Sequence, residues 1–193
     1  MKKTTAIILA IVVIAGLWAI SAYNQMVASQ EEATNAAAGV QSAYQRRADL
    51  IPNLVETVKG YAKHEEETLT GVIEARAKAT AINIDPSNCT PEELQAYQKA
   101  QGELGQALNK LIAVSENYPD LKANENFMDL QKQLEGTENR INEARNKFNS
   151  AVTQYNKEIR SFPKNLFAGL FGFRTMEKFA ADADAQNAPS VKF

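Results

Sequence analysis

The apolar residues divide the chain into one continuous run and a longer region where apolar positions recur periodically. The run covers residues 4–23, which carry no charge, and follows a short basic N-terminus at residues 1–3. A helix needs about 20 residues, at about 1.5 Å each, to cross the hydrocarbon layer of a membrane. Trp18 and Tyr23 lie near one end of the run, where interfacial aromatic residues are enriched. The pattern predicts a transmembrane helix over residues 4–23, with the lipid bilayer as its partner.

A cleavable secretory signal is the alternative for this run. A basic start, an apolar core and the small residues Ala19 and Ser21 fit a loose cleavage pattern. The run exceeds the roughly 7 to 15 residues of a typical signal core, which favours a retained anchor. Lys2 and Lys3 precede the run, and no Lys or Arg follows it until Arg46. This count of basic residues favours a cytoplasmic N-terminus and a domain outside the cytoplasm.

The first periodic stripe begins at Val40, with apolar residues at spacings of three and four. This spacing is typical of one face of a helix. The stripe keeps its phase across Pro52, so we expect one kinked helix from the membrane to about Ala79. A fresh helix capped by Asp49 is the alternative. The turn-forming residues 82–91 predict a break.

Two further stripes predict a second and a third helix. The second covers residues 90–118 and opens with Thr-Pro-Glu-Glu, a capping box with proline at the first helical position. The third covers residues 127–159, and Pro163 ends it. No alternating run of β-branched residues indicates a strand. The fold class is therefore all-α, with an antiparallel bundle of three to four long helices over residues 24–161.

The chain after the bundle is rich in phenylalanine. Five of the eight phenylalanines fall within residues 162–181, between Phe162 and Phe179. We expect this segment to cap the bundle, because an exposed aromatic cluster is the rarer outcome. Three helices would also carry it away from the membrane. The alternative is that it lies on a membrane or on a partner surface. Residues 182–193 are expected to form a flexible tail.

Composition and motifs argue against several classes of function. A net charge of −2 without a basic block makes a nucleic-acid partner unexpected. The lone Cys89 cannot form an internal disulfide or a thiolate metal site, and no partner for a nucleophilic role is identifiable. His64 lacks a second histidine at Thr68 for a zinc site, and Tyr61 stands where a di-iron site needs glutamate. We therefore expect no catalytic residue, no metal, no cofactor and no enzymatic activity.

Charged and amide residues lie beside the apolar stripes of the first and third predicted helices. The first interpretation is a network of ion pairs that fixes the register between helices. The alternative is that Arg46 and Arg47 bind a small anion or a lipid headgroup. The candidate residues are Arg46, Arg47, Asp49, Asn53, Glu138, Arg140 and Arg145.

These residues also carry a family resemblance. The relevant stretches are Arg46-Arg-Ala-Asp-Leu-Ile-Pro-Asn-Leu-Val55, Val58-Lys-Gly-Tyr61, His64-Glu65, Thr137-Glu-Asn-Arg-Ile141 and Phe162-Pro163. In order and spacing they resemble the LemA family of bacterial membrane proteins. The resemblance implies an N-terminal transmembrane helix and a helical bundle. It also implies that the bundle lies in the cytoplasm, opposite to the count of basic residues. It implies no assigned reaction.

The expected function is a non-enzymatic interaction or scaffold protein, tethered to the bacterial cell membrane. Its expected partner, besides the bilayer, is an unidentified membrane or envelope protein. The alternative is a sensing or signalling module that binds a small anion or lipid headgroup at Arg46 and Arg47.

Overall fold

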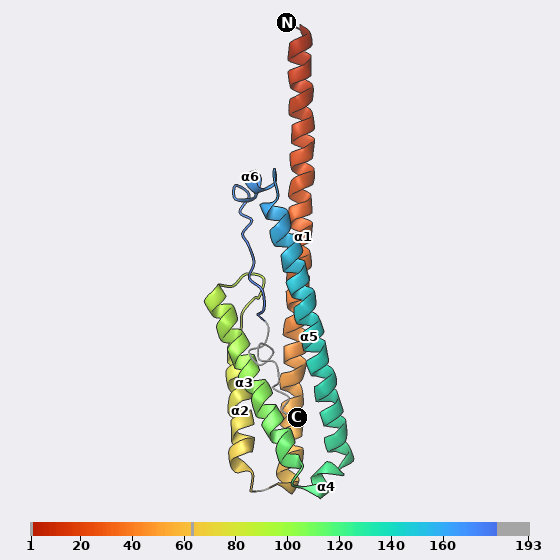
Figure 1. Cartoon of the computed structure of the whole chain (residues 1–193), viewed down its shortest axis with the longest axis vertical. Coiled ribbons are helices and arrows are strands. Elements are labelled where there is room, and N and C mark those ends of the chain that lie inside the picture. The colour runs from red at the N-terminus through yellow and green to blue at the C-terminus, as the bar shows by residue number, and fades with distance from the viewer. Residues whose placement is uncertain (1, 63, 181–193) are drawn as a thin grey trace, which may run out of the picture.

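The structure is a computed structural model, which describes residues 2–62 and 64–180; the predicted tail at residues 182–193 lies outside them. The described residues form helices and no strand (Figure 1). The helices are α1 (Lys2–Tyr61), α2 (Glu66–Ala81), α3 (Pro91–Ser115), α4 (Pro119–Lys122), α5 (Glu125–Arg160) and α6 (Asn165–Ala168). The all-α class and the bundle that follows a long N-terminal helix are confirmed.

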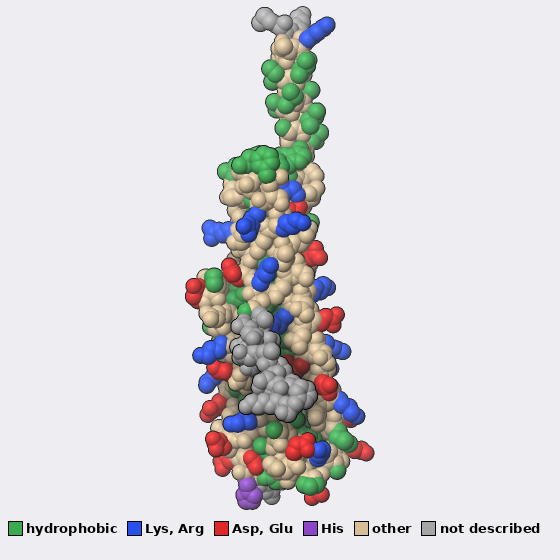
Figure 2. Space-filling model, in the orientation of Figure 1, with side chains coloured by type: hydrophobic (Ala, Val, Ile, Leu, Met, Phe, Trp, Pro, Cys, Tyr) green, Lys and Arg blue, Asp and Glu red, His purple; other side chains and the backbone are tan. Residues whose placement is uncertain are grey.

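The first part of α1 projects from the bundle as a single helix (Figures 1 and 2). Its large apolar side chains are exposed, and only 6% of its most apolar 18-residue window is buried. By length and composition this helix can cross a membrane. It then continues into the bundle without a break, through Pro52 to Tyr61. The predicted continuity across Pro52 is confirmed.

The predicted end of this helix near Ala79 is wrong, because α1 ends at Tyr61 and α2 begins at Glu66 and runs in the opposite direction. Lys59 lies in the last turn of α1, and Glu66 and Glu67 lie in the first turn of α2. These charges favour a helix C-terminus and a helix N-terminus respectively, since they oppose the partial charges of the two helix ends. The bundle therefore has four long helices, and α1, α2, α3 and α5 alternate in direction (Figure 1).

The starts of α3 and α5 follow from local sequence. Thr90 Oγ1 accepts from the Glu93 amide at 3.2 Å, and Glu93 Oε2 accepts from the Thr90 amide at 2.8 Å. This is the predicted capping box, with Pro91 at the first position. Asn124 caps α5 by accepting from the Phe127 amide at 3.0 Å.

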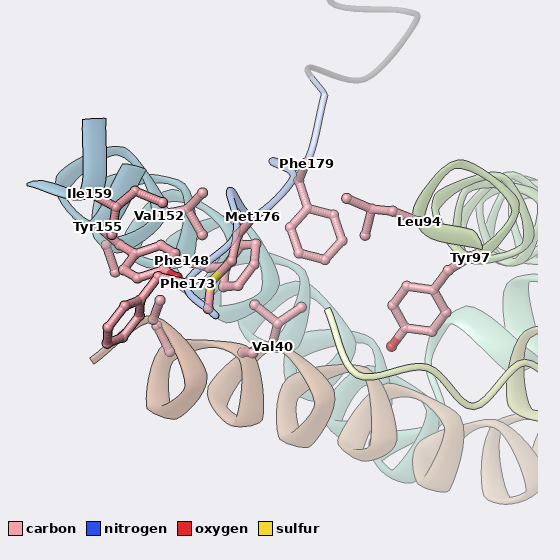
Figure 3. Packing of buried hydrophobic residues seen from close by; sticks show 14 of the residues in the cluster. Val40, Leu94, Tyr97, Phe148, Val152, Tyr155, Ile159, Phe173, Met176 and Phe179 are labelled. Atoms are coloured by element: carbon pink, nitrogen blue, oxygen red, sulfur yellow. The ribbon is translucent and has the colours of Figure 1, made fainter. Parts of the chain in front are cut away.

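Two apolar clusters form the core. The distal cluster joins α1, α2, α3 and the start of α5 around Val58, Leu108 and Phe127. The proximal cluster lies nearer the projecting part of α1 and joins α1, α5, the start of α3 and the chain after α6 (Figure 3). Phe148 and Tyr155 are its largest fully buried members. The seam predicted for α3 is buried from Leu94 to Ser115.

The phenylalanine-rich segment packs against the projecting end of α1. Trp18 and Phe167 have ring centroids 6.1 Å apart, and Tyr23 and Phe171 have centroids 5.2 Å apart. The expectation that the segment points away from the membrane is therefore wrong, because a fourth long helix brings the chain back. The segment caps the bundle only in part, since Ala168, Phe173 and Phe179 are buried whereas Phe162, Leu166, Leu170 and Phe171 are exposed.

Candidate functional site

A buried arginine joins three helices inside the bundle. Arg47, on α1, is 3% exposed. Its Nη1 donates to Oε1 of Glu138 on α5 at 2.9 Å. Its Nη2 donates to the backbone oxygen of Gln101 on α3 at 3.0 Å and to Gln101 Oε1 at 2.6 Å. Charge-assisted hydrogen bonds of this length are the strong ones.

Gln101 extends this network to the fourth long helix. Its Nε2 donates to the backbone oxygen of Ala79, near the end of α2, at 3.3 Å. These bonds form one polar hub, which consists of Arg47, Gln101, Glu138 and the Ala79 carbonyl. The hub connects α1, α2, α3 and α5. Gln101 was missed as a site residue, although a glutamine inside an apolar stripe is a visible signal.

Two tyrosines pack beside the hub. Arg47 Cζ lies 5.1 Å from the centre of the Tyr44 ring, a cation–π contact. Tyr44 and Tyr97 meet edge to face with centroids 5.5 Å apart. Burial raises the pKa of the Tyr97 hydroxyl, Tyr44 adds to the rise, and Arg47 opposes it. Among the described residues, Arg47 Nε has no hydrogen-bond partner although it is buried.

The other predicted site residues lie elsewhere. Arg46, Asp49, Asn53 and Arg140 are exposed, and Asp49 Oδ1 accepts from Gln45 at 2.7 Å. Arg145 Nη2 donates to the backbone oxygen of Ala180 at 2.7 Å, and its guanidinium lies 5.5 Å from the Phe179 ring centre. Of the seven candidates, the structure brings only Arg47 and Glu138 together in the hub.

A second polar contact compensates for the proline in α1. Pro52 has no amide hydrogen, so it cannot donate to the Ala48 carbonyl four residues earlier. Arg76 of α2 donates its Nε to that carbonyl at 2.8 Å. Because Ala48 is 3% exposed, this bond satisfies an acceptor that water does not reach freely.

A cavity of about 490 Å³ lies beside the hub, between α1, the end of α2 and α3. Tyr44, Tyr97 and Gln101 contribute to its wall, as does Ile84, whose backbone oxygen accepts from Gln41 Nε2 at 2.7 Å. The side chains that line it are amides, hydroxyls and apolar groups, and none carries a formal charge. The cavity therefore offers no cation to an anionic ligand.

The two residues weighed for chemistry stand apart from the hub. His64 is exposed in the turn between α1 and α2. Cys89 is half-buried, and burial raises its pKa, with further rises from Glu93, Asp85 and Glu177. In residues 2–62 and 64–180, no group of three or more His, Cys, Asp and Glu side chains is placed to hold a metal ion.

Two asparagines of α5 hold the segment that follows α6. Asn156 Nδ2 donates to the Met176 oxygen at 2.8 Å, and Asn156 Oδ1 accepts from the Met176 amide at 2.9 Å. Asn149 makes the same pair with Phe179, both at 2.9 Å. Phe173, Met176 and Phe179, every third residue, are buried in the proximal cluster (Figure 3). These clamps were not predicted from the sequence, because the asparagines bind backbone groups of the segment.

Together, an exposed apolar helix and a continuous four-helix bundle with an internally paired arginine define a membrane-associated helical protein. The sequence model of the LemA family matches residues 36–193. The chain belongs to the LemA family.

Individual relatives are more distant. The chain is 27% identical over 118 residues to protein LemA of Metamycoplasma hominis, which covers 61% of this chain and 50% of that protein. It is 26% identical over 174 residues to the magnetosome protein MamQ of Magnetospirillum gryphiswaldense, with 81% and 64% coverage. Magnetosome protein MamQ 2 of Paramagnetospirillum magneticum is 27% identical over 174 residues, with the same coverage. The chain thus spans between half and two thirds of the length of these relatives.

Proposed function

We propose that this protein is a non-catalytic scaffold, tethered to the cell membrane by the start of α1, whose bundle engages another membrane or envelope protein. The observation that carries the proposal is the hub. Arg47, the buried candidate for binding an external anion, is bonded to Glu138 and Gln101 and ties α1 to α5 and α3. The polar interior thus serves the rigidity of the bundle.

The shape of the molecule supports the same role. From Tyr23 to Tyr61, α1 continues for about 57 Å at about 1.5 Å per residue, so the bundle forms a long rod (Figure 1). Such a rod presents protein surface far from the bilayer. Large apolar side chains at Ile73 on α2 and Met128 on α5 are exposed on it, 53% and 39% respectively.

The proposal is tested with a photo-crosslinking amino acid in the full-length chain in native membranes. We place it at Ile73 and at Met128, two exposed apolar positions. We also place it at Thr153, an exposed polar position on α5, so that both apolar and polar surfaces of the bundle are sampled. The expected result is a reproducible crosslink from one or more of these positions to the same membrane or envelope protein, absent without irradiation. If all three positions yield no reproducible protein adduct, the scaffold proposal fails.

The alternative, a module that senses an anion or lipid headgroup, has less support. Arg46 is exposed and Arg47 is buried, so the two arginines do not form one cationic site. A rise in melting temperature with inorganic phosphate that disappears in Arg46→Gln would favour this alternative over the scaffold.

A further inference from the structure

An apolar surface patch lies where the bundle meets the projecting part of α1. Its members are exposed and come from the turn after α5, from α6 and from the turn that follows α6. We call it the apolar cap; it consists of Phe162, Leu166, Leu170 and Phe171, with exposed fractions of 80%, 64%, 80% and 47%. Figure 2 shows apolar side chains gathered at this end of the bundle, at the foot of the projecting helix. Soluble surfaces rarely carry such a patch without a partner.

The cap is fixed at a known height along α1. Phe167, beneath the cap, packs on Trp18, and Phe171 packs on Tyr23. Phe173, which follows, also meets Tyr23, with centroids 5.7 Å apart. The cap therefore stands level with the stretch of α1 between Trp18 and Tyr23.

The length of the apolar helix places that stretch at the edge of the hydrocarbon layer. From Lys3 to Trp18 the helix rises only about 22 Å, whereas the hydrocarbon layer is about 30 Å thick. A span of about 30 Å ends near Tyr23. If α1 crosses the bilayer, the membrane boundary therefore passes between Trp18 and Tyr23, at the height of the cap.

The basic residues beside the cap also fit a position at the membrane interface. Lys157, Arg160 and Arg174 are exposed near it, and Lys164 is paired with Glu158 and hydrogen-bonded to Gln25. Apolar and aromatic side chains with Lys and Arg beside them are the composition of segments that bind the membrane interface. Trp18 and Tyr23 supply the interfacial aromatic residues.

We propose that the apolar cap is a second membrane-binding site, whose side chains insert among the headgroups and upper acyl chains of the leaflet on the bundle side. The chain then contacts the bilayer at two points, the span of α1 and the cap. Two contacts fix the height and the tilt of the rod, because α1 alone could tilt within the bilayer or shift along its normal. The ligand is the bilayer surface itself.

The test measures the depth of labelled side chains in the full chain reconstituted into liposomes of phosphatidylcholine and phosphatidylglycerol. A nitrobenzoxadiazole label is attached to Leu170→Cys in a Cys89→Ala background. Asp120→Cys, exposed at the far end of the bundle, is the negative control, and Leu17→Cys in the span is the positive control. Quenching is measured with lipids that carry a spin label near the headgroup.

We expect the label at residue 170 to be quenched at least threefold more strongly than the label at residue 120, with blue-shifted emission. Equal quenching at residues 170 and 120 would overturn the proposal. A blue shift at residue 170 without quenching by spin-labelled lipid would also overturn it, because the cap would then be covered by protein. None of these outcomes depends on the protein partner of the scaffold proposal.

Discussion

At the scale of single residues, the buried guanidinium of Arg47 is the central feature. Burying a charge is costly unless it is paired and hydrogen-bonded, and Arg47 gains one carboxylate and two oxygens of Gln101. Glu138 is 40% exposed, so water screens the ion pair and its net contribution to stability is modest. We infer that the larger effect is on specificity, because a shift of α1 against α3 or α5 would break these bonds.

Replacing Arg47 with methionine should destabilise the fold. Gln101 would lose the donor for two buried oxygens, which costs about 1–3 kcal/mol, while Glu138 could turn to solvent. Arg46→Met is the matched control, since Arg46 is exposed, and we expect it to change stability by less than about 0.5 kcal/mol. Urea titration in mild detergent, followed by circular dichroism, measures both. An Arg47→Met protein as stable as the wild type would contradict the structural role.

Pro52 and Arg76 should be energetically coupled. Arg76→Met leaves the buried Ala48 carbonyl without its donor and should cost about 1–3 kcal/mol. In a Pro52→Ala background residue 52 regains its amide hydrogen and can bond Ala48, so the same substitution should cost about 0.5–1.5 kcal/mol less. The four unfolding free energies form a double-mutant cycle. Additive effects would show that Arg76 does not replace the missing helical bond.

Part of the hub was predictable from the sequence. Apolar positions at Tyr44 and Ile51 bracket a gap in the stripe at Arg47, so a polar side chain had to occupy an inward position there. The pairing of Arg47 with Glu138 agrees with the expected network between helices. Arg46 and Arg47 have the same side-chain chemistry, so only their positions in the helical repeat indicate that Arg47 faces inward. The sequence marks Gln101 only as a polar residue within the apolar stripe of α3.

At the scale of elements, the reversal between α1 and α2 is a feature that the periodicity of apolar residues does not predict. The apolar stripe continues from α1 into α2 at helical spacing, so it does not reveal that two helices carry it. Neither proline nor a cluster of turn residues marks the reversal. The available signals were Gly60, a poor helix former, and the glutamates at the start of α2, which suit a helix N-terminus.

The clamp on the segment after α6 depends on matched spacing. Asn149 and Asn156 are seven residues apart, which is about 10.5 Å of helix, and they bind backbone groups three residues apart, which is about 10 Å of extended chain. The segment therefore runs extended and antiparallel to α5. No periodicity in the segment alone would identify this partner, because the bonds go to its backbone.

Asn156→Ala should release this segment locally. Two neutral hydrogen bonds are lost, at about 1 kcal/mol each, so the local opening equilibrium should rise roughly 10- to 30-fold. Arg174 and Lys178 are exposed trypsin sites within the segment, and their cleavage rates report its opening. Asn146→Ala, at an exposed asparagine of the same helix, should leave the rates unchanged. Equal cleavage in the two variants would show that the clamp contributes nothing.

At the scale of the whole molecule, the number of long helices decides which residues face the membrane. Three helices would have placed the phenylalanine-rich segment at the far end of the bundle. The fourth returns α5 to the projecting end of α1 (Figure 1). Lys157 and Arg160 lie in the last turn of α5, and Lys164 and Arg174 flank α6. A count of basic residues near the ends of the span in sequence includes only Lys2 and Lys3. In the folded protein, more basic residues therefore lie at the bundle end of the span than at its N-terminal end, which is the reverse of the count along the sequence.

This reversal predicts the side of the membrane. The cytoplasmic leaflet is anionic, and each Lys or Arg near its surface contributes about 1 kcal/mol of attraction. Lys164 is neutralised by its ion pair with Glu158, which leaves Lys157, Arg160 and Arg174 near the cap against Lys2 and Lys3 at the N-terminus. This balance favours a cytoplasmic bundle, as the family resemblance also implies. Cys89 is a poor reporter, because burial raises its pKa and so lowers the reactive thiolate fraction at a given pH.

The reporter we choose is Asn109→Cys in a Cys89→Ala background, at an exposed position of α3. With the bundle in the cytoplasm, a membrane-impermeant maleimide should label this cysteine only after spheroplasts are lysed. Wild-type Cys89 should react several-fold more slowly in the same lysate, since its thiol is half-buried and its pKa is raised. Labelling of Asn109→Cys in intact spheroplasts would place the bundle outside the cytoplasm. The two lysines at the N-terminus would then outweigh the basic residues that folding gathers near the cap.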